Sequence, residues 1–341
     1  MNVPLDHNRD LYYRLIALWV VCEAFAGGLM HAAKIPFTGM IVSSLAVTCI
    51  IFIAYFVPGS TAIIKATVTV AVFKLMLSPH SPPTAYIAVF FQGYLGHLLF
   101  NGRKHFALSA VLLAVLALVE SALQRILVLL IIYGNTFWDA VDKYVQKIAG
   151  GGDKNYSQIT ALGYIAIHAV GGIIIGILAV RLVRKAERWK THYPELIISD
   201  NEEQSIGYEV KKKKKTLKPL FIILWVLLLI MIIHAYIFPE YAVIPKNDVL
   251  RIILRSVLIL FSWYLILIPI IKKLIERKLA SERVKQKLPL KEILDLLPRI
   301  KNVFNQSMHL SAVERGLGRV KLFCKILFVN ILSAKESVLQ K

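Results

Sequence analysis

Apolar stretches long enough to cross a membrane recur along this chain, and basic residues gather in alternate connections between them. A helix needs about 20 predominantly apolar residues to cross the hydrocarbon core of a bilayer. Hydrophobic residues make up 57% of the 341 residues and charged residues only 18%, too few to cover a soluble globule of this size. The sequence therefore predicts an all-α, polytopic integral membrane protein. Eight segments are near the required length, at residues 13–33, 38–57, 61–78, 83–100, 106–133, 159–181, 219–238 and 250–271.

The distribution of Lys and Arg predicts how these segments are oriented. With the N-terminus in the cytoplasm, Arg103, Lys104, the connection 181–218 and the C-terminal tail all lie on the cytoplasmic side, as the positive-inside rule requires. The opposite orientation would place five consecutive lysines, 211–215, outside the cell. We therefore expect both termini in the cytoplasm. The formal net charge of +20 is concentrated in these segments, so it predicts attraction to anionic membrane lipid and not a nucleic-acid site.

A polar segment divides the chain. Residues 185–217 carry an acidic cluster followed by five lysines and lack apolar periodicity, which is typical of a cytoplasmic basic linker. It separates a six-helix membrane unit, residues 1–184, from a transmembrane helical hairpin, residues 218–278. The connection 134–157 between two apolar segments has balanced charge and three consecutive glycines, so we expect a loop on the outer side.

The last part of the chain, residues 279–341, has apolar residues at helical spacing with Lys and Glu between them, interrupted by Pro298. We expect amphipathic cytoplasmic helices at the membrane surface. The run from Val320 to Ser333 is apolar but short for a span and carries two lysines, so it is expected to lie at the interface or to pack on the hairpin.

Polar side chains inside the apolar segments are the first candidates for a functional site, because a charged group at the bilayer centre costs a few kcal/mol unless it faces a partner or water. Glu23 and His31 share one face of a helix, and so do Glu120 and Gln124. We expect a polar cluster that is open to the outer side and binds a small molecule. The candidate substrate-binding residues are Glu23, His31, Lys74, Gln92, Glu120, Gln124, Arg125 and His168.

Two structural alternatives stand beside this hypothesis. Glu23 or Glu120 can pair with Lys74 or Arg125 as a buried structural ion pair, which would leave no ligand site. His168 precedes Gly172 by four residues, so it can equally be a packing histidine in the seam that Gly172-x-x-x-Gly176 predicts. Gly93-x-x-Gly96 predicts a second close helix contact beside Gln92.

No catalytic motif appears in the chain. A P-loop, HExxH, GxSxG and Asp-rich diphosphate motifs are all missing from the sequence, so we predict that the protein is not an enzyme and that a partner or a gradient supplies energy. The three cysteines, Cys22, Cys49 and Cys324, lie far apart and predict neither a zinc site nor a disulfide framework. No cofactor or metal is indicated.

Residues 1–184 resemble the substrate-binding (S) subunits of energy-coupling factor (ECF) transporters. The resemblance rests on six helices, the small-residue row Ala24, Gly28 and Ala32, short Pro-containing turns and the outward polar cluster. The tail segment 311–318, SAVERGLG, looks like the coupling-helix pattern of the transmembrane (T) subunits, which ends in Arg-Gly.

The resemblance implies a transport component of a bacterial-type cytoplasmic membrane that takes up a vitamin-like small molecule. It also implies separate ATPase or transmembrane subunits as partners, with Glu314, Arg315 and Gly316 in the coupling contact. Two other function classes stay open: a membrane enzyme or assembly factor acting on lipid or polyprenyl-linked substrates, and a scaffold whose basic tail recruits cytoplasmic partners. A tightly retained vitamin would favour transport, whereas co-purifying lipid with turnover would favour the enzyme.

Overall fold

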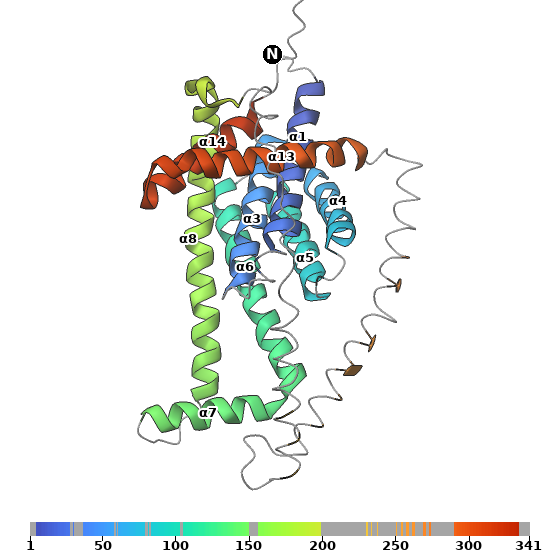
Figure 1. Cartoon of the computed structure of the whole chain (residues 1–341), viewed down its shortest axis with the longest axis vertical. Coiled ribbons are helices and arrows are strands. Elements are labelled where there is room, and N and C mark those ends of the chain that lie inside the picture. The colour runs from blue at the N-terminus through green and yellow to red at the C-terminus, as the bar shows by residue number, and fades with distance from the viewer. Residues whose placement is uncertain are drawn as a thin grey trace, which may run out of the picture. The chain divides into compact units, whose positions relative to one another are not determined.

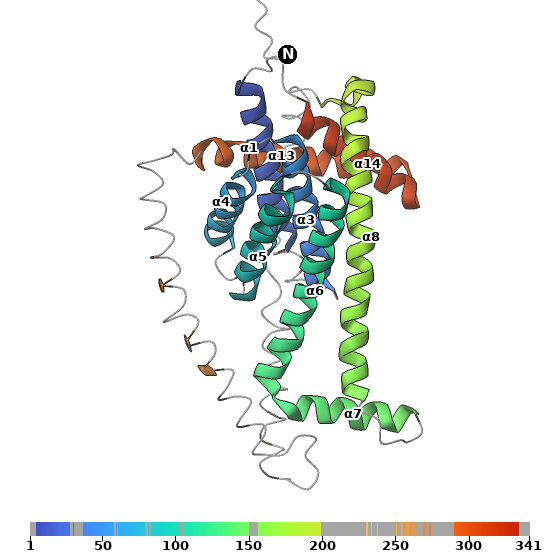
Figure 2. The ribbon, with the colours of Figure 1, turned by 180° about the vertical axis from the view of Figure 1, so that it is seen from behind.

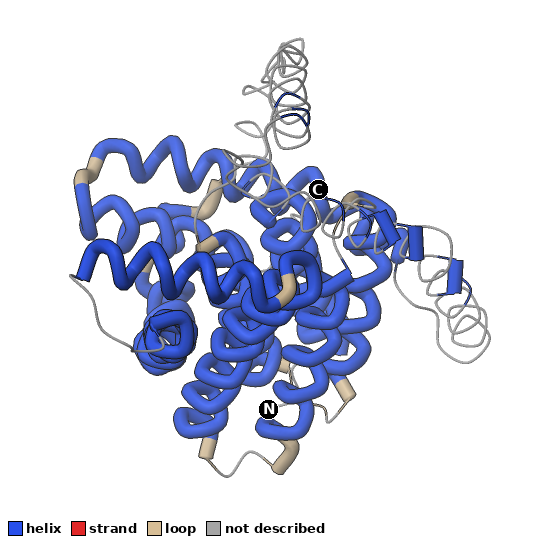
Figure 3. The backbone as a smooth tube through the Cα atoms, turned by 90° about the horizontal axis from the view of Figure 1, so that it is seen from below, coloured by secondary structure: helices blue, strands red, loops and turns tan. Residues whose placement is uncertain are grey.

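The described part of the protein is helical throughout. In the computed structural model the described residues form helices and short connections, and none of them forms a strand, which confirms the all-α prediction for this part of the chain (Figure 3). His31 and most of the predicted hairpin, residues 218–278, lie outside it. The structure describes residues 5–27, 30, 37–57, 59, 61–78, 81, 83–102, 105–149, 156–198 and 290–333, and isolated positions between 230 and 273.

The chain forms two compact units. The first contains residues 1–125, 160–203 and 278–341, and the second contains residues 126–159 and 204–277. Two long helices, α6 and α8, run from one unit into the other. The helices up to residue 196 are α1 Leu5–Val20, the π-helix η1 Val21–Ala26, α3 Thr38–Phe56, α4 Ala62–Leu77, α5 Pro83–Phe100, α6 Phe106–Tyr133, α7 Asn135–Ala149, α8 Tyr156–His192 and the 3-10 helix η2 Pro194–Leu196 (Figure 1).

Three described helices, α3, α6 and α8, are long and apolar enough to cross a membrane. A shorter apolar helix covers Thr84–Phe100 within α5. The bounds of α3, α5 and α6 follow the apolar runs of the sequence closely, because a helix pairs its backbone polar groups within the run. Helix α1 begins before its predicted run, and α8 begins before and ends well after its own. These helices are compatible with a membrane location.

Glycines allow the helices of the first unit to approach each other closely. A Cβ added at Gly172 would lie 2.5 Å from Cα of Val115 in α6, and a Cβ added at Gly176 would lie 2.6 Å from Cα of Val111. The predicted rows at Gly172 and Gly93 therefore form tight contacts, since a Cβ at Gly93 would likewise overlap Thr67 of α4. Gly28 and Ala32 of the third predicted row lie outside the described residues. The core between α1, α3 and α4 is filled by large buried side chains, including Trp19, Phe52 and Phe73.

The C-terminal helices belong to the first unit and pack on its N-terminal helices. Helix α13, Leu290–Leu310, lies across α1 (Figure 1) and buries Ile293, Leu297 and Ile300 against it. The apolar face therefore contacts protein, whereas the sequence predicted a helix at the membrane surface. The predicted interruption at Pro298 is wrong, because α13 continues through it. Pro298 is exposed, so water can satisfy the carbonyl group that a proline leaves without a donor.

A 3-10 turn, η4 Ser311–Val313, connects α13 to α14, Gly316–Leu332. The ring of Phe328 in α14 stacks on Phe52 of α3 with centroids 4.3 Å apart. Asn330 accepts a hydrogen bond from the backbone N–H of Ile198 and donates one to the carbonyl oxygen of Leu196. The run 320–333, predicted at the interface or on the hairpin, thus contacts α3 through Phe328 and the segment around η2 through Asn330.

The second unit includes helix α7, Asn135–Ala149, in a connection that the sequence predicted to be a loop. Gly134 ends α6 in a left-handed conformation, with φ of 68°, and donates its N–H to the carbonyl oxygen of Leu130. Helix α7 begins at the next residue. It therefore occupies most of the connection 134–157, because its residues keep helical periodicity although their net charge is balanced.

Candidate functional site

The buried ion pair between Glu23 and Lys74 is the clearest polar feature of the interior. Lys74 Nζ lies 2.6 Å from Oε2 of Glu23, and the two side chains are only 5% and 3% exposed. Glu23 belongs to η1, where the backbone changes from an α-helix to a π-helix. Such π-helical turns are rare and are enriched at functional sites. The structure therefore places one predicted ligand residue in an uncommon backbone and gives it a charged partner.

Lys74 makes two further contacts with α5. Its Nζ also donates to the carbonyl oxygen of Ala85, at 3.3 Å, and lies 6.0 Å from the ring centroid of Tyr86. Ala85 and Tyr86 belong to the first turns of α5, so the ammonium group joins α4, η1 and α5. A buried pair with these contacts fits the structural alternative, and it also fits a polar site that is closed in this conformation.

Gln92 lies on α5 and faces α3. Its Nε2 donates to Oγ of Ser43 at 3.1 Å, and the residue is 1% exposed. Within the described residues Oε1 of Gln92 has no hydrogen-bond partner. An unpaired buried amide oxygen costs about 1–3 kcal/mol, so a ligand or a water molecule that donated to it would be stabilised here.

Glu120, Gln124 and Arg125 lie along α6. Gln124 Nε2 donates to Oε1 of Glu120, as their spacing of four residues predicted. The other carboxylate oxygen of Glu120 is buried and has no partner in the part of the chain that the structure describes. Arg125 is exposed. The alternative ion pair between Glu120 and Arg125 is therefore not formed here.

His168 is fully buried in an aromatic cluster. Its Nδ1 lies 2.9 Å from the carbonyl oxygen of Tyr164, one turn earlier in α8, and the two rings are 4.4 Å apart between centroids. The ring of Phe37 lies 6.2 Å from His168 and 6.1 Å from Tyr164. Phe37 has a positive φ of 58°, which is uncommon for a large residue. Nε2 of His168 has no partner among the described residues.

The structure thus brings together two of the predicted pairs, Glu23 with Lys74 and Glu120 with Gln124. Gln92 and His168 occupy separate positions, and no hydrogen bond or ion pair between described residues joins the four places. Sequence reasoning missed Ser43, Phe37 and Tyr164 as partners. Tyr164 carried a signal, because it precedes His168 by four residues and hence shares its helix face.

The elbow between α13 and α14 contains the predicted coupling residues Glu314, Arg315 and Gly316. Glu314 and Arg315 are extended, and Gly316 has φ of 57°, a left-handed value that glycine adopts without strain. All three residues are exposed. The side chains of Val313 and Leu317, which flank them, are each 89% exposed. The elbow therefore presents two apolar side chains and a guanidinium group to the outside of the described structure.

The carboxylate of Glu314 folds over the first turn of α14. A Cβ added at Gly318 would lie 2.8 Å from Oε2 of Glu314, so only glycine leaves room for this arrangement without a shift. A carboxylate beside a helix N-terminus interacts favourably with the helix dipole. Glu314 consequently helps to fix the start of α14, while Arg315 is left for other contacts.

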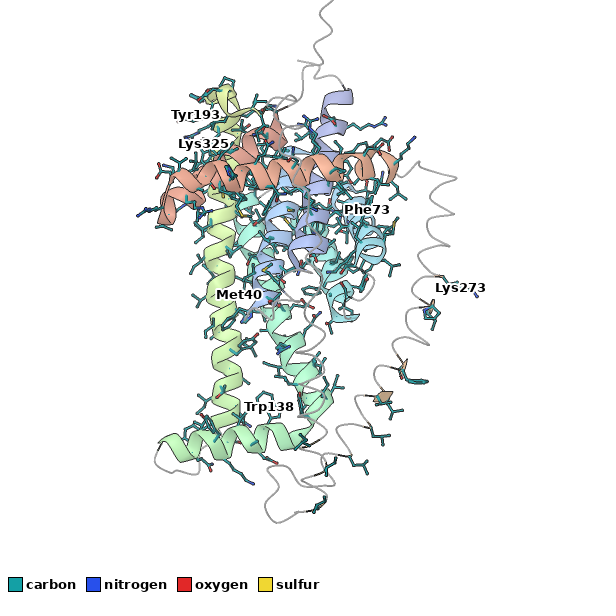
Figure 4. The ribbon with its side chains drawn as sticks, in the orientation of Figure 1. Met40, Phe73, Trp138, Tyr193, Lys273 and Lys325 are labelled. Carbon is teal, nitrogen blue, oxygen red and sulfur yellow. The ribbon has the colours of Figure 1, made fainter. Side chains whose placement is uncertain are left out.

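Charged side chains connect α14 to α1 and to Tyr193, which directly follows α8. Arg14 of α1 is buried, pairs with Asp10 at 2.9 Å and donates to the carbonyl oxygen of Ser333, at the end of α14. Burial lowers the pKa of Lys190, and the nearby charge of Arg14 lowers it further. Elsewhere on α14 the ammonium group of Lys325 lies 3.8 Å from the ring centroid of Tyr193 (Figure 4).

An open groove of about 520 Å³ follows the α1–α13 contact. It is lined by Arg9 and Glu292, which form an exposed ion pair at 3.6 Å, and by Tyr13, whose neutral hydroxyl group accepts from Nε of Arg9 at 3.1 Å. In the described residues no cluster of three or more His, Cys, Asp or Glu side chains is arranged to hold a metal ion. No family model, curated protein or solved structure matches the chain.

Proposed function

We propose that the protein is a membrane transport component that binds a small, vitamin-like molecule from the outer side and couples to separate ATPase subunits for uptake. In this proposal residues 1–184 form the six-helix binding unit, both termini lie in the cytoplasm, and the elbow 311–318 is the contact to the ATPase. The proposal combines the predicted topology with the position of the polar residues and the exposed elbow.

The observation that carries the proposal is that α1 contacts α13 and leads directly into η1, which contains Glu23. Its first turns pack against α13, and its continuation into η1 carries Glu23 and hence the ion pair with Lys74. One element therefore contacts both the elbow helices and the interior polar residues. A partner that moves the elbow would act on the binding unit through this helix.

The unpaired buried atoms support a ligand-binding role. Oε1 of Gln92, Oε2 of Glu120 and Nε2 of His168 have no partner among the described residues. Each such atom costs about 1–3 kcal/mol when it is left without a hydrogen bond, so a polar ligand that satisfied even some of them would gain affinity. A charged ligand would also compete for Glu23 or Lys74. These contacts suit a small polar molecule better than a lipid chain.

The elbow suits a protein partner. Val313 and Leu317 would bury apolar surface in a hydrophobic groove, and Arg315 would donate in a bidentate manner to a carboxylate or to the last carbonyl groups of a helix. The rigid docking of α14 through Phe328 and Asn330 holds this surface in place. Docking of a pre-organised surface loses less conformational entropy than docking of a mobile tail.

The coupling contact is tested by Arg315→Lys, with Arg319→Lys as a matched control on the exposed surface of α14. Lysine keeps the charge but loses the planar donor fork, so Arg315→Lys should reduce uptake and ATPase co-purification while ligand retention stays unchanged. Arg319→Lys should be silent in all three measurements. Wild-type uptake and co-purification of Arg315→Lys would contradict the coupling role.

Native mass spectrometry of the gently solubilised protein tests the function class. Transport predicts a retained small polar molecule and an ATPase partner in the same spectrum. Co-purifying lipid without either would contradict transport and favour the lipid enzyme or assembly factor.

A further inference from the structure

Helix α7 has a continuous apolar face. Trp138, Val141 and Val145 follow one another at helical spacing of three and four residues, while Asp139 and Lys143 lie on the other side and are exposed. At 1.5 Å per residue, its 15 residues span about 22 Å. A strongly amphipathic helix of this kind has to cover its apolar face with protein or with lipid.

Protein buries this face only in part in the described structure. None of the residues 138–146 is buried, and even Trp138, Val141 and Val145 keep part of their surface exposed. Helix α13 is the internal comparison, because it is equally amphipathic but buries Ile293, Leu297 and Ile300 to 6% exposure or less against its neighbours. The two helices share an amphipathic pattern and differ in how completely protein covers the apolar face.

The connections of α7 place it at the end of apolar helices. Gly134 is the single residue between α7 and α6, and α6 is long and apolar enough to cross a membrane. Helix α8, which has the same property, begins a few residues after α7. In Figure 1 and Figure 2 α7 runs across the direction of the last turns of α6. Helix α7 therefore connects the end of α6 to the start of α8, where these two helices would leave the hydrocarbon core if they cross a membrane.

Asp142 fixes the rotation of α7 about its own axis. Its carboxylate accepts from the backbone N–H of Ser157 at 2.5 Å and from Oγ of Ser157 at 2.8 Å, in the first turn of α8. Successive residues of a helix are rotated by about 100°, so Trp138 and Val145 point within about 60° of Asp142. The apolar face is thus turned toward the side on which α8 begins, and Ala140 points away from it.

We propose that α7 is an interfacial helix that lies in the head-group region of the bilayer which α6 and α8 enter, with Trp138, Val141 and Val145 in the acyl-chain boundary. Trp138 and Tyr133, at the end of α6, suit this depth, because Trp and Tyr concentrate at membrane interfaces. In this proposal lipid covers the part of the apolar face that protein leaves exposed. This inference does not depend on the transported molecule or on which side of the membrane α7 faces.

The net charge of α7 predicts whether its binding depends on the charge of the lipid head groups. The helix contains Asp139, Asp142, Lys143 and Lys147, which balance one another. Its binding therefore comes from burial of apolar surface and not from attraction to anionic head groups. We expect insertion of α7 to be the same in zwitterionic and in anionic membranes and to be insensitive to salt.

The test uses single cysteines in the full chain, labelled with bimane and reconstituted in phosphatidylcholine vesicles. Val141→Cys and Val145→Cys should be quenched several-fold more by brominated lipid than Asp139→Cys and Lys143→Cys, which aqueous iodide should quench instead. Cys324→Ala removes the half-buried native thiol, and Cys22 and Cys49 are buried. Ile300→Cys on the covered face of α13 is the matched control and should respond weakly to both quenchers.

Each other outcome contradicts the proposal. Quenching of Val141→Cys and Val145→Cys by iodide alone would mean that α7 stands in water, and quenching by neither agent would mean that protein covers the face. A strong increase of lipid quenching when phosphatidylglycerol is added would show that charge drives the binding. Substitution of both valines by aspartate should abolish lipid quenching at a bimane placed at position 138.

Discussion

At the scale of single residues, burial decides what the charged side chains of this protein can do. Lys74 is enclosed by the carboxylate of Glu23, a carbonyl oxygen and an aromatic ring. Lys65, on the same helix, is exposed. The buried ammonium group of Lys74 has lost its hydration and depends on the carboxylate of Glu23, whereas the exposed ammonium group of Lys65 needs no protein partner.

We expect Lys74→Met or Glu23→Gln to lower the free energy of unfolding by about 3 kcal/mol, because each leaves one buried charge without its partner. The double variant should lose less than the sum of the two, since no charge then remains buried. Chemical or thermal unfolding in detergent measures these differences. Lys65→Met is the matched control and should be nearly neutral.

The same variants separate a structural pair from a ligand contact. Ligand retention that falls only in proportion to folded protein would assign the pair a structural role alone. Reduced retention in well-folded Glu23→Gln would place Glu23 in the binding site. A Lys74→Met variant as stable as Lys65→Met would mean that the pair is not formed in the membrane.

At the scale of elements, backbone contact between α6 and α8 depends on the glycines of α8. The Cβ of an alanine at position 172 would meet backbone atoms of α6, which cannot rotate away as a side chain can. The two helices would have to separate, and every contact along the seam would weaken.

Gly172→Ala should therefore destabilise the protein by about 1–3 kcal/mol, the usual cost of overpacking. Gly163→Ala is a matched control on the same helix, because a Cβ there would meet nothing within 4 Å. It should be neutral or stabilising by up to about 1 kcal/mol, since alanine favours a helix more than glycine does. Equal melting temperatures of the two variants would argue against the close seam.

At the scale of the whole molecule, orientation rests on the distribution of Lys and Arg. A cysteine at Gly151 should react with an impermeant thiol reagent applied from outside, and a cysteine at Lys213 should react only after the membrane is opened. Both positions lie outside the described residues, so the prediction comes from the sequence. The reverse pattern of labelling would invert the proposed topology and move the candidate site to the cytoplasmic half.

The apolar helices of the first unit and the closest contacts between them could be predicted from the sequence, whereas α7 could not. Helix bounds such as 38–56 and 83–100 follow from local apolar runs, and the seams at Gly93 and Gly172 follow from the spacing of small residues. The hydrogen bond between Glu120 and Gln124 was also foreseeable, because the residues are one turn apart. All of these are short-range properties of a helix.

Only the tertiary structure decided which distant residues meet. Glu23 and Lys74 are 51 residues apart, and several pairings of the buried charges satisfied the sequence equally well. The amphipathic pattern of α13 is the same whether lipid or protein covers it, and the structure places it against α1. Periodicity specifies that a face must be buried, whereas the order and rotation of the packed helices specify what buries it.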